Sequence, residues 1–259
     1  MRVYSPVECR LSRAFARRSA GRLAIGICPC QSSPPLAEDM GLIDRKEKGS
    51  VIAVDGPAAS GKGSIARALA SQLRLPHMDT GLLYRAVALN LWRWGGDPSS
   101  EFEALRACDH LGFDPDDPEL RSEPVSKIAS LISAYPSVRS ALLERQQDFA
   151  NQPGGAVLDG RDIGTVIAPD AAVKLFVSAS PEVRASRRLK ELQGRGMKAH
   201  YEEVLADIHA RDARDSGREV APLRPAADAL LLDTSDLSLD EAIAEALRLA
   251  EERLARAES

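Results

Sequence analysis

Short apolar segments alternate with longer segments of helical periodicity from residue 51 to the end of the chain. Apolar runs of four or five residues bounded by turn-forming residues are typical of buried strands, whereas apolar residues spaced three and four apart are typical of amphipathic helices. This alternation predicts an α/β fold in which a five-stranded parallel sheet is flanked by helices. The predicted strands are Val51–Val54, Leu75–Met78, Ala156–Leu158, Val173–Val177 and Ala229–Leu232.

Helices are predicted on both faces of this sheet, and one long insertion interrupts the alternation. The predicted helices are Gly63–Leu73, Gly81–Trp94, Val125–Asn151, Pro181–Leu192, His200–Arg214 and Ser238–Ala257. The insertion separates the second and third strands, and its middle, residues 113–124, is acidic and contains several prolines. We expect that segment to form a surface loop or a small hairpin. The insertion as a whole is expected to act as a cap over a second substrate.

Length and composition describe a soluble globular protein with one principal domain. The chain has 259 residues, of which 44% are hydrophobic and 28% are charged, enough to bury a substantial core. A net charge of −4 argues against a general nucleic-acid binder, which usually carries a broad basic surface. No apolar stretch is long enough to cross a bilayer. Neither nucleic acid nor a membrane is therefore an expected partner.

The cysteines favour a reducing compartment. The four of them, Cys9, Cys28, Cys30 and Cys108, show neither the spacing of a zinc site nor that of a disulfide framework. Disulfides are rare in the cytoplasm, where thiols are kept reduced. We therefore expect a cytoplasmic protein.

Residues 1–48 differ in composition from the rest of the chain. They contain six arginines and only one acidic residue before Glu38. A targeting peptide has this composition, but the helical periodicity here is short, and Gly21 and Pro29 interrupt it. We favour a disordered extension, or upstream sequence translated ahead of a start at Met40, over a targeting peptide.

The first predicted strand leads directly into a glycine-rich segment and then into a helix. This segment, GPAASGKGS, consists of Gly56, Pro57, Ala58, Ala59, Ser60, Gly61, Lys62, Gly63 and Ser64. Glycines allow backbone N–H groups to turn around phosphate oxygens, the helix N-terminus favours an anion, and the lysine adds a positive charge. The segment predicts a phosphate-binding loop for a nucleoside triphosphate.

The hydroxyl group of this loop is displaced by one position. Gly63 follows Lys62, where a serine or threonine hydroxyl would approach magnesium, and the hydroxyl is carried by Ser64 instead. We expect Ser64 to act on the metal through water or to contact phosphate.

Two further polar segments follow predicted strands. Asp79–Arg85, DTGLLYR, places a carboxylate, a hydroxyl and an arginine where ligands bind in open α/β folds. In the alternative, Asp79 and Thr80 only cap the next helix. Asp159–Asp162, DGRD, places three charged residues around one glycine, more than a structural turn needs. Asp159 stands where an acidic residue could hold magnesium through water.

Arginines are dense in the last third of the chain. Helical spacing puts Arg184, Arg187 and Arg188 on one shared face. It puts Arg211, Arg214 and Asp215 on another. Surface ion pairs would explain any one of them. Phosphoryl transfer between two phosphorylated molecules, however, gathers negative charges that guanidinium groups can clamp. Arg195 lies between two glycines and is expected to belong to a mobile lid.

Six segments, taken together, resemble a single enzyme family. They are GPAASGKGS, DTGLLYR, SLISAYPSVR, LDGRDIGTVIAPDA, ARDARDSGREVAPLRPA and LLLDTSDLS, all between residues 50 and 253. The chain resembles the bacterial cytidylate kinases (CMP kinases), which are P-loop nucleoside monophosphate kinases. The resemblance implies the fold of that family. It also implies magnesium-dependent transfer of the γ-phosphoryl group of ATP to CMP or dCMP, giving ADP and CDP or dCDP.

The resemblance implies a role for each matching residue. Residues 56–64, with Arg184 and Arg188, would bind ATP, and Ser64 and Asp159 would approach the metal. Arg85 and Arg161 would hold the acceptor phosphate. The other acceptor contacts would be Ser130, Arg139 and Asp162 at the cytosine, Arg211 and Asp215 at the sugar, Arg218, and Thr80, which stands where serine is common. The catalytic groups would be Lys62, Arg161, Arg188 and Arg211.

The resemblance also implies a division of the chain. The kinase domain would span residues 49–258, with a core at 49–82 and 154–258, a monophosphate-binding insertion at about 83–153 and a lid at about 186–200. Only 60 positions separate Asp79 from Arg139, so the insertion is shorter than in some bacterial members. We expect a monomer.

Two other functions would use the same loop. An adenylate or shikimate kinase is the nearest enzyme alternative, and the segments Asp159–Asp162 and Arg211–Arg218 disfavour it. A nucleotide-dependent switch is the other. The sequence has no N-K-x-D motif for reading guanine, and its arginines suit a second anionic ligand better than a switch.

Overall fold

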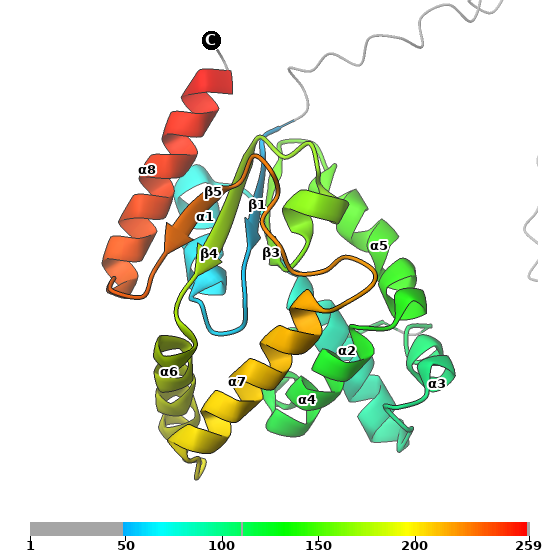
Figure 1. Ribbon diagram of the computed structural model, residues 1–259. Coiled ribbons are helices and arrows are strands. Elements are labelled where there is room, and N and C mark those ends of the chain that lie inside the picture. The colour runs from blue at the N-terminus through cyan, green and yellow to red at the C-terminus, as the bar shows by residue number, and fades with distance from the viewer. Residues whose placement is uncertain (1–48, 110, 258–259) are drawn as a thin grey trace, which may run out of the picture. The chain divides into compact units, whose positions relative to one another are not determined.

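The computed structural model describes residues 49–109 and 111–257, and a sheet of five parallel strands forms its centre (Figure 1). The strands are β1 (Val51–Asp55), β2 (His77–Asp79), β3 (Ala156–Gly160), β4 (Val173–Ser178) and β5 (Leu230–Asp233). Their order in the sheet is β2-β3-β1-β4-β5. The predicted five-stranded parallel sheet is confirmed. The expected N-terminal extension, with Cys9, Cys28 and Cys30, lies outside the described residues.

Helices connect these strands. They are α1 (Lys62–Leu73), α2 (Thr80–Trp94), α3 (Glu101–Arg106), α4 (Glu123–Ile132), α5 (Pro136–Ala150), α6 (Pro181–Gly194), α7 (Tyr201–Ser216) and α8 (Leu239–Ala257), with a 3₁₀ helix, η1 (Pro118–Arg121), and a π-helical turn, η2 (Ile163–Ile167).

The central strands are buried on both faces. Ile52 of β1 stands beside Val157 of β3 and Val173 of β4, and none of the three is exposed to solvent. Successive residues of a strand point to opposite faces, so Ile52 and Ala53 serve different layers. Ile52 packs with α1 and α8, whereas Ala53 packs with α5 and η2. This is the three-layer arrangement that the unbroken apolar runs predict.

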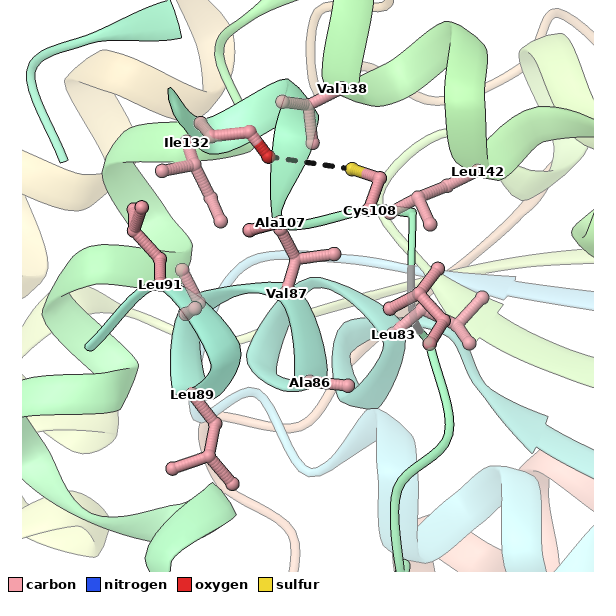
Figure 2. Close-up of a cluster of buried hydrophobic side chains, with 14 of the residues drawn as sticks. Leu83, Ala86, Val87, Leu89, Leu91, Ala107, Cys108, Ile132, Val138 and Leu142 are labelled. Atoms are coloured by element: carbon pink, nitrogen blue, oxygen red, sulfur yellow. Dashed lines mark hydrogen bonds between the residues drawn. The ribbon is translucent and has the colours of Figure 1, made fainter. Parts of the chain in front are cut away.

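The insertion between β2 and β3 has a hydrophobic core of its own (Figure 2). Leu83, Val87 and Leu91 recur every four residues on α2, and they lie in one cluster with Ile132 of α4 and Leu142 of α5. Burying one such side chain contributes roughly 1.5–3 kcal/mol relative to leaving it exposed. The insertion is therefore a packed layer that can hold site residues in place.

The prediction of one helix at Val125–Asn151 is wrong. The segment forms α4 and α5, and residues 133–135 separate them. Pro136 begins α5, and Tyr135 before it has φ −74° and ψ 122°, which is extended. A proline clashes with a helical conformation of the residue before it, so the helix cannot continue through this point. The break places Ser130 near the end of one helix and Arg139 near the start of the next.

The acidic part of the insertion is more helical than expected. Residues 113–124 contain η1 and the first residues of α4 instead of only a loop or hairpin. The short helix α3 was also missed. Ser100 accepts a hydrogen bond from the Glu103 backbone N–H at 3.3 Å, which is the capping contact that an S-x-x-E sequence favours.

Two helices, α6 and α7, form a hairpin at the carboxyl ends of the strands (Figure 1). Ala185 and Leu192 of α6 pack with Val204 and Ile208 of α7. The expected lid at about 186–200 corresponds to the second part of α6 and the connection to α7.

Cys108 is a buried free thiol in the insertion core, and its Sγ donates to the Ala104 carbonyl oxygen at 3.5 Å (Figure 2). Among the helices within residues 49–109 and 111–257, none combines the length and the apolar character that a membrane span needs.

Candidate active site

The phosphate-binding loop follows β1, the strand from which the chain connections run to opposite sides of the sheet. The chain leaves β1 toward the β2 side of the sheet and later returns to β4 on the other side, and ligands bind at such a point in open α/β sheets. Gly56 has φ +154°, and a Cβ atom there would lie 2.0 Å from the Val177 carbonyl oxygen, so the position requires glycine. The loop ends at the N-terminus of α1, whose first N–H groups have no partner within the helix.

Lys62 is the first residue of α1. Its Nζ donates to the Pro57 carbonyl oxygen of the same loop at 3.5 Å. Burial, with added repulsion from Arg161 and Arg211, lowers the pKa of Lys62 to about 7. An anionic ligand would favour the charged form and raise this pKa again. The lysine is therefore placed to respond to a phosphate group.

The DGRD turn begins within β3 and contacts the start of α2. The Thr80 Oγ1 donates to the Asp159 carbonyl oxygen at 2.8 Å. A Cβ atom at position 160 would lie 2.6 Å from the same Oγ1, so Gly160 lets the turn and α2 approach this closely. Thr80 therefore has a structural role in this contact.

His77 contacts Asp159, which sequence reasoning missed. β2 covers His77–Asp79 and not Leu75–Met78, because pairing with β3 begins after Pro76, whose carbonyl accepts the Val157 N–H. Asp79 then lies opposite Asp159, and His77 is a diagonal neighbour on the same face. The His77 Nε2 is 2.8 Å from the Asp159 Oδ1.

Arg139 and Asp162 form a buried ion pair between α5 and the DGRD turn. Arg139 also donates to the Ser133 carbonyl oxygen at 3.2 Å, and its guanidinium carbon lies 5.7 Å from the centre of the Tyr84 ring. This wall of the site therefore offers N–H donors and carboxylate oxygens side by side, as recognition of a base edge requires.

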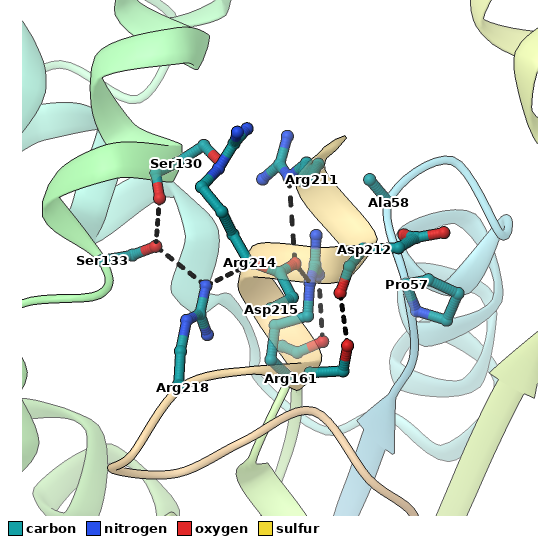
Figure 3. A network of polar contacts seen from close by, with 12 residues as sticks. Pro57, Ala58, Ser130, Ser133, Arg161, Arg211, Asp212, Arg214, Asp215 and Arg218 are labelled. Carbon is teal, nitrogen blue, oxygen red and sulfur yellow. Dashed lines mark hydrogen bonds and ion pairs between the residues drawn. The ribbon is translucent and has the colours of Figure 1, made fainter. Parts of the chain in front are cut away.

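Three arginines surround the buried carboxylate of Asp215 on α7 (Figure 3). The Arg161 Nε donates to its Oδ2 at 2.8 Å, Arg218 pairs with its Oδ1, and the Arg211 Nε lies 3.9 Å from its Oδ2. Burial opposes ionisation of Asp215, but the three arginines hold its pKa below the usual value. Burial, with repulsion from Arg161, lowers the pKa of Arg211 to about 9. One carboxylate cannot neutralise three guanidinium groups, so the cluster favours an anionic ligand.

Hydroxyl groups at the end of α4 connect to α7 and to the residues that follow it. Arg214 donates to the Ser130 Oγ at 3.2 Å, and Arg218 donates to the Ser133 Oγ at 2.9 Å (Figure 3). The sequence prediction placed Arg214 on one helix face with Arg211 but gave it no specific role, and it gave Ser133 none. Ser133 lies one helical turn after Ser130, which is the only signal that the sequence offered.

Arg85 is oriented by the insertion. Its Nη1 donates to the Leu120 carbonyl oxygen at 3.1 Å and to the Ser126 Oγ at 2.7 Å. Burial lowers its pKa. These contacts hold the guanidinium group in position.

Arg184 is buried behind the phosphate-binding loop. Its Nη2 lies 2.6 Å from the Asp212 Oδ2, and its Nη1 donates to the Ala58 carbonyl oxygen at 3.3 Å. Arg187, which received no role from the sequence, donates to the Thr234 carbonyl oxygen at 2.6 Å. Both arginines belong to α6 and donate to carbonyl oxygens of the phosphate-binding loop, so α6 supports the loop.

Arg188, by contrast, points toward the carboxylates at the edge of the site. It pairs with Glu123 at the start of α4, and its Nη1 lies 2.7 Å from the Glu191 Oε2. The ion pair with Glu123 joins the insertion to α6, the helix in which the predicted lid begins.

Most of the predicted site residues line one cavity of about 490 Å³. These are Ala58, Ala59, Lys62, Gly63, Thr80, Arg85, Ser130, Arg139, Asp159, Arg161, Asp162, Arg188, Arg211, Asp215 and Arg218. Ser60, Gly61 and Ser64 line a second cavity of about 480 Å³, with Arg187, Thr234 and Leu237, and Ala59 and Arg188 line both cavities. Gly56, Pro57 and Arg184 line neither of these two cavities.

The donor set at the cavity fits a magnesium ion only with help from a ligand. The Asp159 Oδ2 would lie 3.5 Å from a Cβ atom at position 63, so the carboxylate faces the start of α1. Among the residues that the structure describes, no three His, Cys, Asp or Glu side chains form a metal cluster. Magnesium commonly binds through one or two carboxylates, phosphate oxygens and water, which matches this arrangement.

Comparison with known proteins gives a consistent result. The family model described as "Cytidylate kinase" matches residues 52–252. A protein named cytidylate kinase from Azorhizobium caulinodans is 55% identical over 203 residues, covering 78% of this chain and 98% of its own. A protein of the same name from Xanthobacter autotrophicus is 56% identical over 207 residues, covering 79% of this chain and 99% of its own. With the loop, the DGRD turn and the arginine cluster at one cavity, these matches show that the chain belongs to the cytidylate kinase family.

Proposed function

We propose that this protein transfers the γ-phosphoryl group of ATP to CMP or dCMP, giving ADP and CDP or dCDP. The observation that carries the proposal is the single cavity that Lys62 shares with the Arg139–Asp162 pair and the arginines around Asp215. A phosphate-binding loop alone would suit many nucleotide-binding proteins. A second wall rich in arginines across the same cavity supports a second, anionic substrate.

ATP binds at the phosphate loop. Its phosphates accept hydrogen bonds from the backbone N–H groups of residues 56–64 and contact Lys62 and Arg188. Its nucleoside lies in the second cavity, beside Thr234 and Leu237. Arg184 supports the loop through the Ala58 carbonyl oxygen.

CMP binds on the insertion side. Arg85 and Arg161 hold its phosphate, because both guanidinium groups line the cavity near Lys62. The cytosine lies against Ser130, Arg139 and Asp162, whose hydroxyl, guanidinium and carboxylate groups supply the donors and acceptors that a base edge needs. The remaining contacts are Arg211 and Asp215 at the sugar, with Arg218 behind them.

Magnesium supplies charge neutralisation at the ATP phosphates when it is bound, and Asp159 and Ser64 would hold it, in part through water. His77 contacts one oxygen of Asp159 and leaves the other facing Gly63. This fixes the orientation of the carboxylate. The displaced hydroxyl of Ser64 agrees with contact through water.

Catalysis rests on alignment and electrostatics. The acceptor phosphate already carries the nucleophilic oxygen, so no serine or histidine nucleophile is needed. Lys62, Arg161, Arg188 and Arg211 stabilise the charge that spreads over the transferring group. The insertion at about 83–153 and the lid at about 186–200 close over the core and exclude water, which would otherwise act as acceptor.

The protein acts in the cytoplasm as a monomer. The one cysteine in the described part of the chain is a free, buried thiol, in agreement with a reducing compartment. Both proposed substrates contact residues of a single chain, so the site is complete without a second copy.

The test is ADP formation from magnesium and ATP with one acceptor at a time: CMP, dCMP, UMP, AMP or shikimate. We expect CMP and dCMP to stimulate turnover strongly and Lys62→Ala to abolish it. A preference for AMP or shikimate would contradict the assigned contacts of Ser130, Arg139 and Asp162. ATP binding without stimulation by any acceptor would instead favour a nucleotide-dependent switch.

A further inference from the structure

Asp55 links two segments of the site that are far apart in the sequence. It is the last residue of β1, immediately before the phosphate-binding loop, and its exposed fraction is 5%. Its Oδ1 accepts the Ile163 N–H and its Oδ2 accepts the Gly164 N–H, each at 2.8 Å. These two residues directly follow Arg161 and Asp162.

The contact satisfies a local need of the backbone. Ile163 and Gly164 begin the π-helical turn η2, and the first N–H groups of a helical segment have no partner within it. A carboxylate with two oxygens accepts both hydrogen bonds at once, and its negative charge suits the positive end of the turn. An asparagine could accept only one, because its NH₂ group is a donor.

The buried carboxylate is retained without a direct cationic partner. Within residues 49–109 and 111–257, no lysine, arginine or histidine forms an ion pair with Asp55. Lys174 packs along Gly164, but its Nζ is directed to Asp228 at 2.8 Å. A buried charge of this kind is costly, so hydrogen bonds to the turn are its main compensation.

We propose that Asp55 is a positioning residue that aligns the two substrates with each other. This inference rests on the proposed function. Through η2, Asp55 sets where Arg161 and Asp162 stand relative to the phosphate-binding loop. Those two residues hold the acceptor phosphate and base in the proposed function, and the loop holds the donor. The contact therefore controls the distance between the attacking oxygen of the acceptor phosphate and the γ-phosphoryl group of ATP. The rate of phosphoryl transfer depends steeply on this distance.

The test compares Asp55→Asn with Asp228→Asn. Asp228→Asn removes a carboxylate from the same region without touching η2, so it is a matched control. For Asp55→Asn we expect kcat/KM for CMP to fall about tenfold or more, mainly through kcat, while KM for ATP changes less than about threefold. Asp228→Asn should keep the kinetic constants of the original protein even if its melting temperature falls.

Several outcomes would overturn the proposal. These are unchanged CMP kinetics in folded Asp55→Asn, equal losses for ATP and CMP, or the same kinetic loss in Asp228→Asn. If Asp55→Asn does not fold, Asp55→Glu decides, because it keeps both carboxylate oxygens as acceptors for Ile163 and Gly164, but its extra methylene group moves the turn relative to the phosphate-binding loop. That variant should show a loss of about threefold or more for CMP, and unchanged kinetics would refute the inference. A failure of the proposed function is distinct, because the unaltered protein would then show no CMP-dependent ADP formation.

Discussion

Asp215 shows how single residues set the charge of the site. It accepts hydrogen bonds from Arg161 and Arg218 and lies near Arg211, so a single carboxylate orients three guanidinium groups. Asp215 is itself buried, and it holds the three guanidinium groups together where unpaired positive charges would repel each other. The net positive charge that remains is available to an anionic substrate. The cluster therefore combines rigidity with a preference for phosphate.

Replacement of Arg161 tests this arrangement at the scale of one residue. We expect Arg161→Ala to lower kcat/KM for CMP by on the order of a hundredfold or more, because a charge-assisted contact to the transferring or accepting phosphate is lost. Folding should be little affected, since Asp215 keeps Arg218 as a partner. The measurement is steady-state kinetics together with a thermal unfolding curve.

Arg145→Ala is the control for Arg161→Ala. Arg145 is an exposed residue of α5 and does not line the cavity. It should leave kcat/KM unchanged. A folded Arg161→Ala protein with full activity toward CMP would remove Arg161 from the site.

At the scale of elements, the sequence predicted what local chemistry determines. The parallel strands, the glycine-rich loop and the polar turns at strand ends could be predicted, because apolar runs and glycines report backbone requirements directly. The break between α4 and α5 also had a local signal, Pro136, but the apolar periodicity continues on both sides of it and predicted one long helix. The contact of Asp55 with Gly164 spans 109 positions and had no local signal at all. Pairings of this kind follow from the sheet order, which periodicity does not reveal.

Three contacts tie the start of the α4 region to the α6–α7 hairpin. Glu123 pairs with Arg188, Arg195 donates to the Arg121 carbonyl oxygen at 3.0 Å, and the Lys127 Nζ lies 3.7 Å from the Asp207 Oδ2. Arg188 thus has two carboxylate partners, Glu123 and Glu191. In the proposed function, the phosphates of ATP would replace these carboxylates as partners of Arg188.

Glu123→Gln tests this exchange. Because the substitution removes a competing carboxylate from a partly exposed arginine, we expect KM for ATP to fall by about two- to fivefold, the equivalent of a modest ion pair. The measurement is ATP saturation at fixed CMP. Glu144→Gln, an exposed change on α5, is the control and should have no effect. A higher KM for ATP would mean that the Glu123–Arg188 pair assists binding instead of competing with it.

At the scale of the whole molecule, two buried groups at the site oppose each other in their response to pH. Burial raises the pKa of Asp55 to about 7 and lowers that of Lys62 to about 7. For Asp55 the folded protein binds its proton more tightly than the unfolded chain, so this contribution to stability is complete below pH 3.8 and is lost as the pH rises through about 7. For Lys62 the unfolded chain binds the proton more tightly, so its contribution is complete above pH 10.5 and is lost as the pH falls through about 7.

The free energy of unfolding, measured by denaturant titration between pH 5 and 8, separates these effects. Relative to Asp55→Asn, the original protein should lose roughly 2–3 kcal/mol over this range, since one pKa unit corresponds to about 1.4 kcal/mol and only the original protein must ionise a buried carboxyl group. Asp228→Asn should show no such pH-dependent difference from the original protein, because the hydrogen bond from Lys174 lowers the pKa of Asp228 and this carboxylate stays ionised between pH 5 and 8 in the folded and the unfolded chain. A difference between the original protein and Asp55→Asn that does not change with pH would mean that Asp55 is already ionised throughout this range. The contact with η2 would then be a permanent charged anchor, and the activity of the enzyme would not depend on the ionisation of Asp55 near neutral pH.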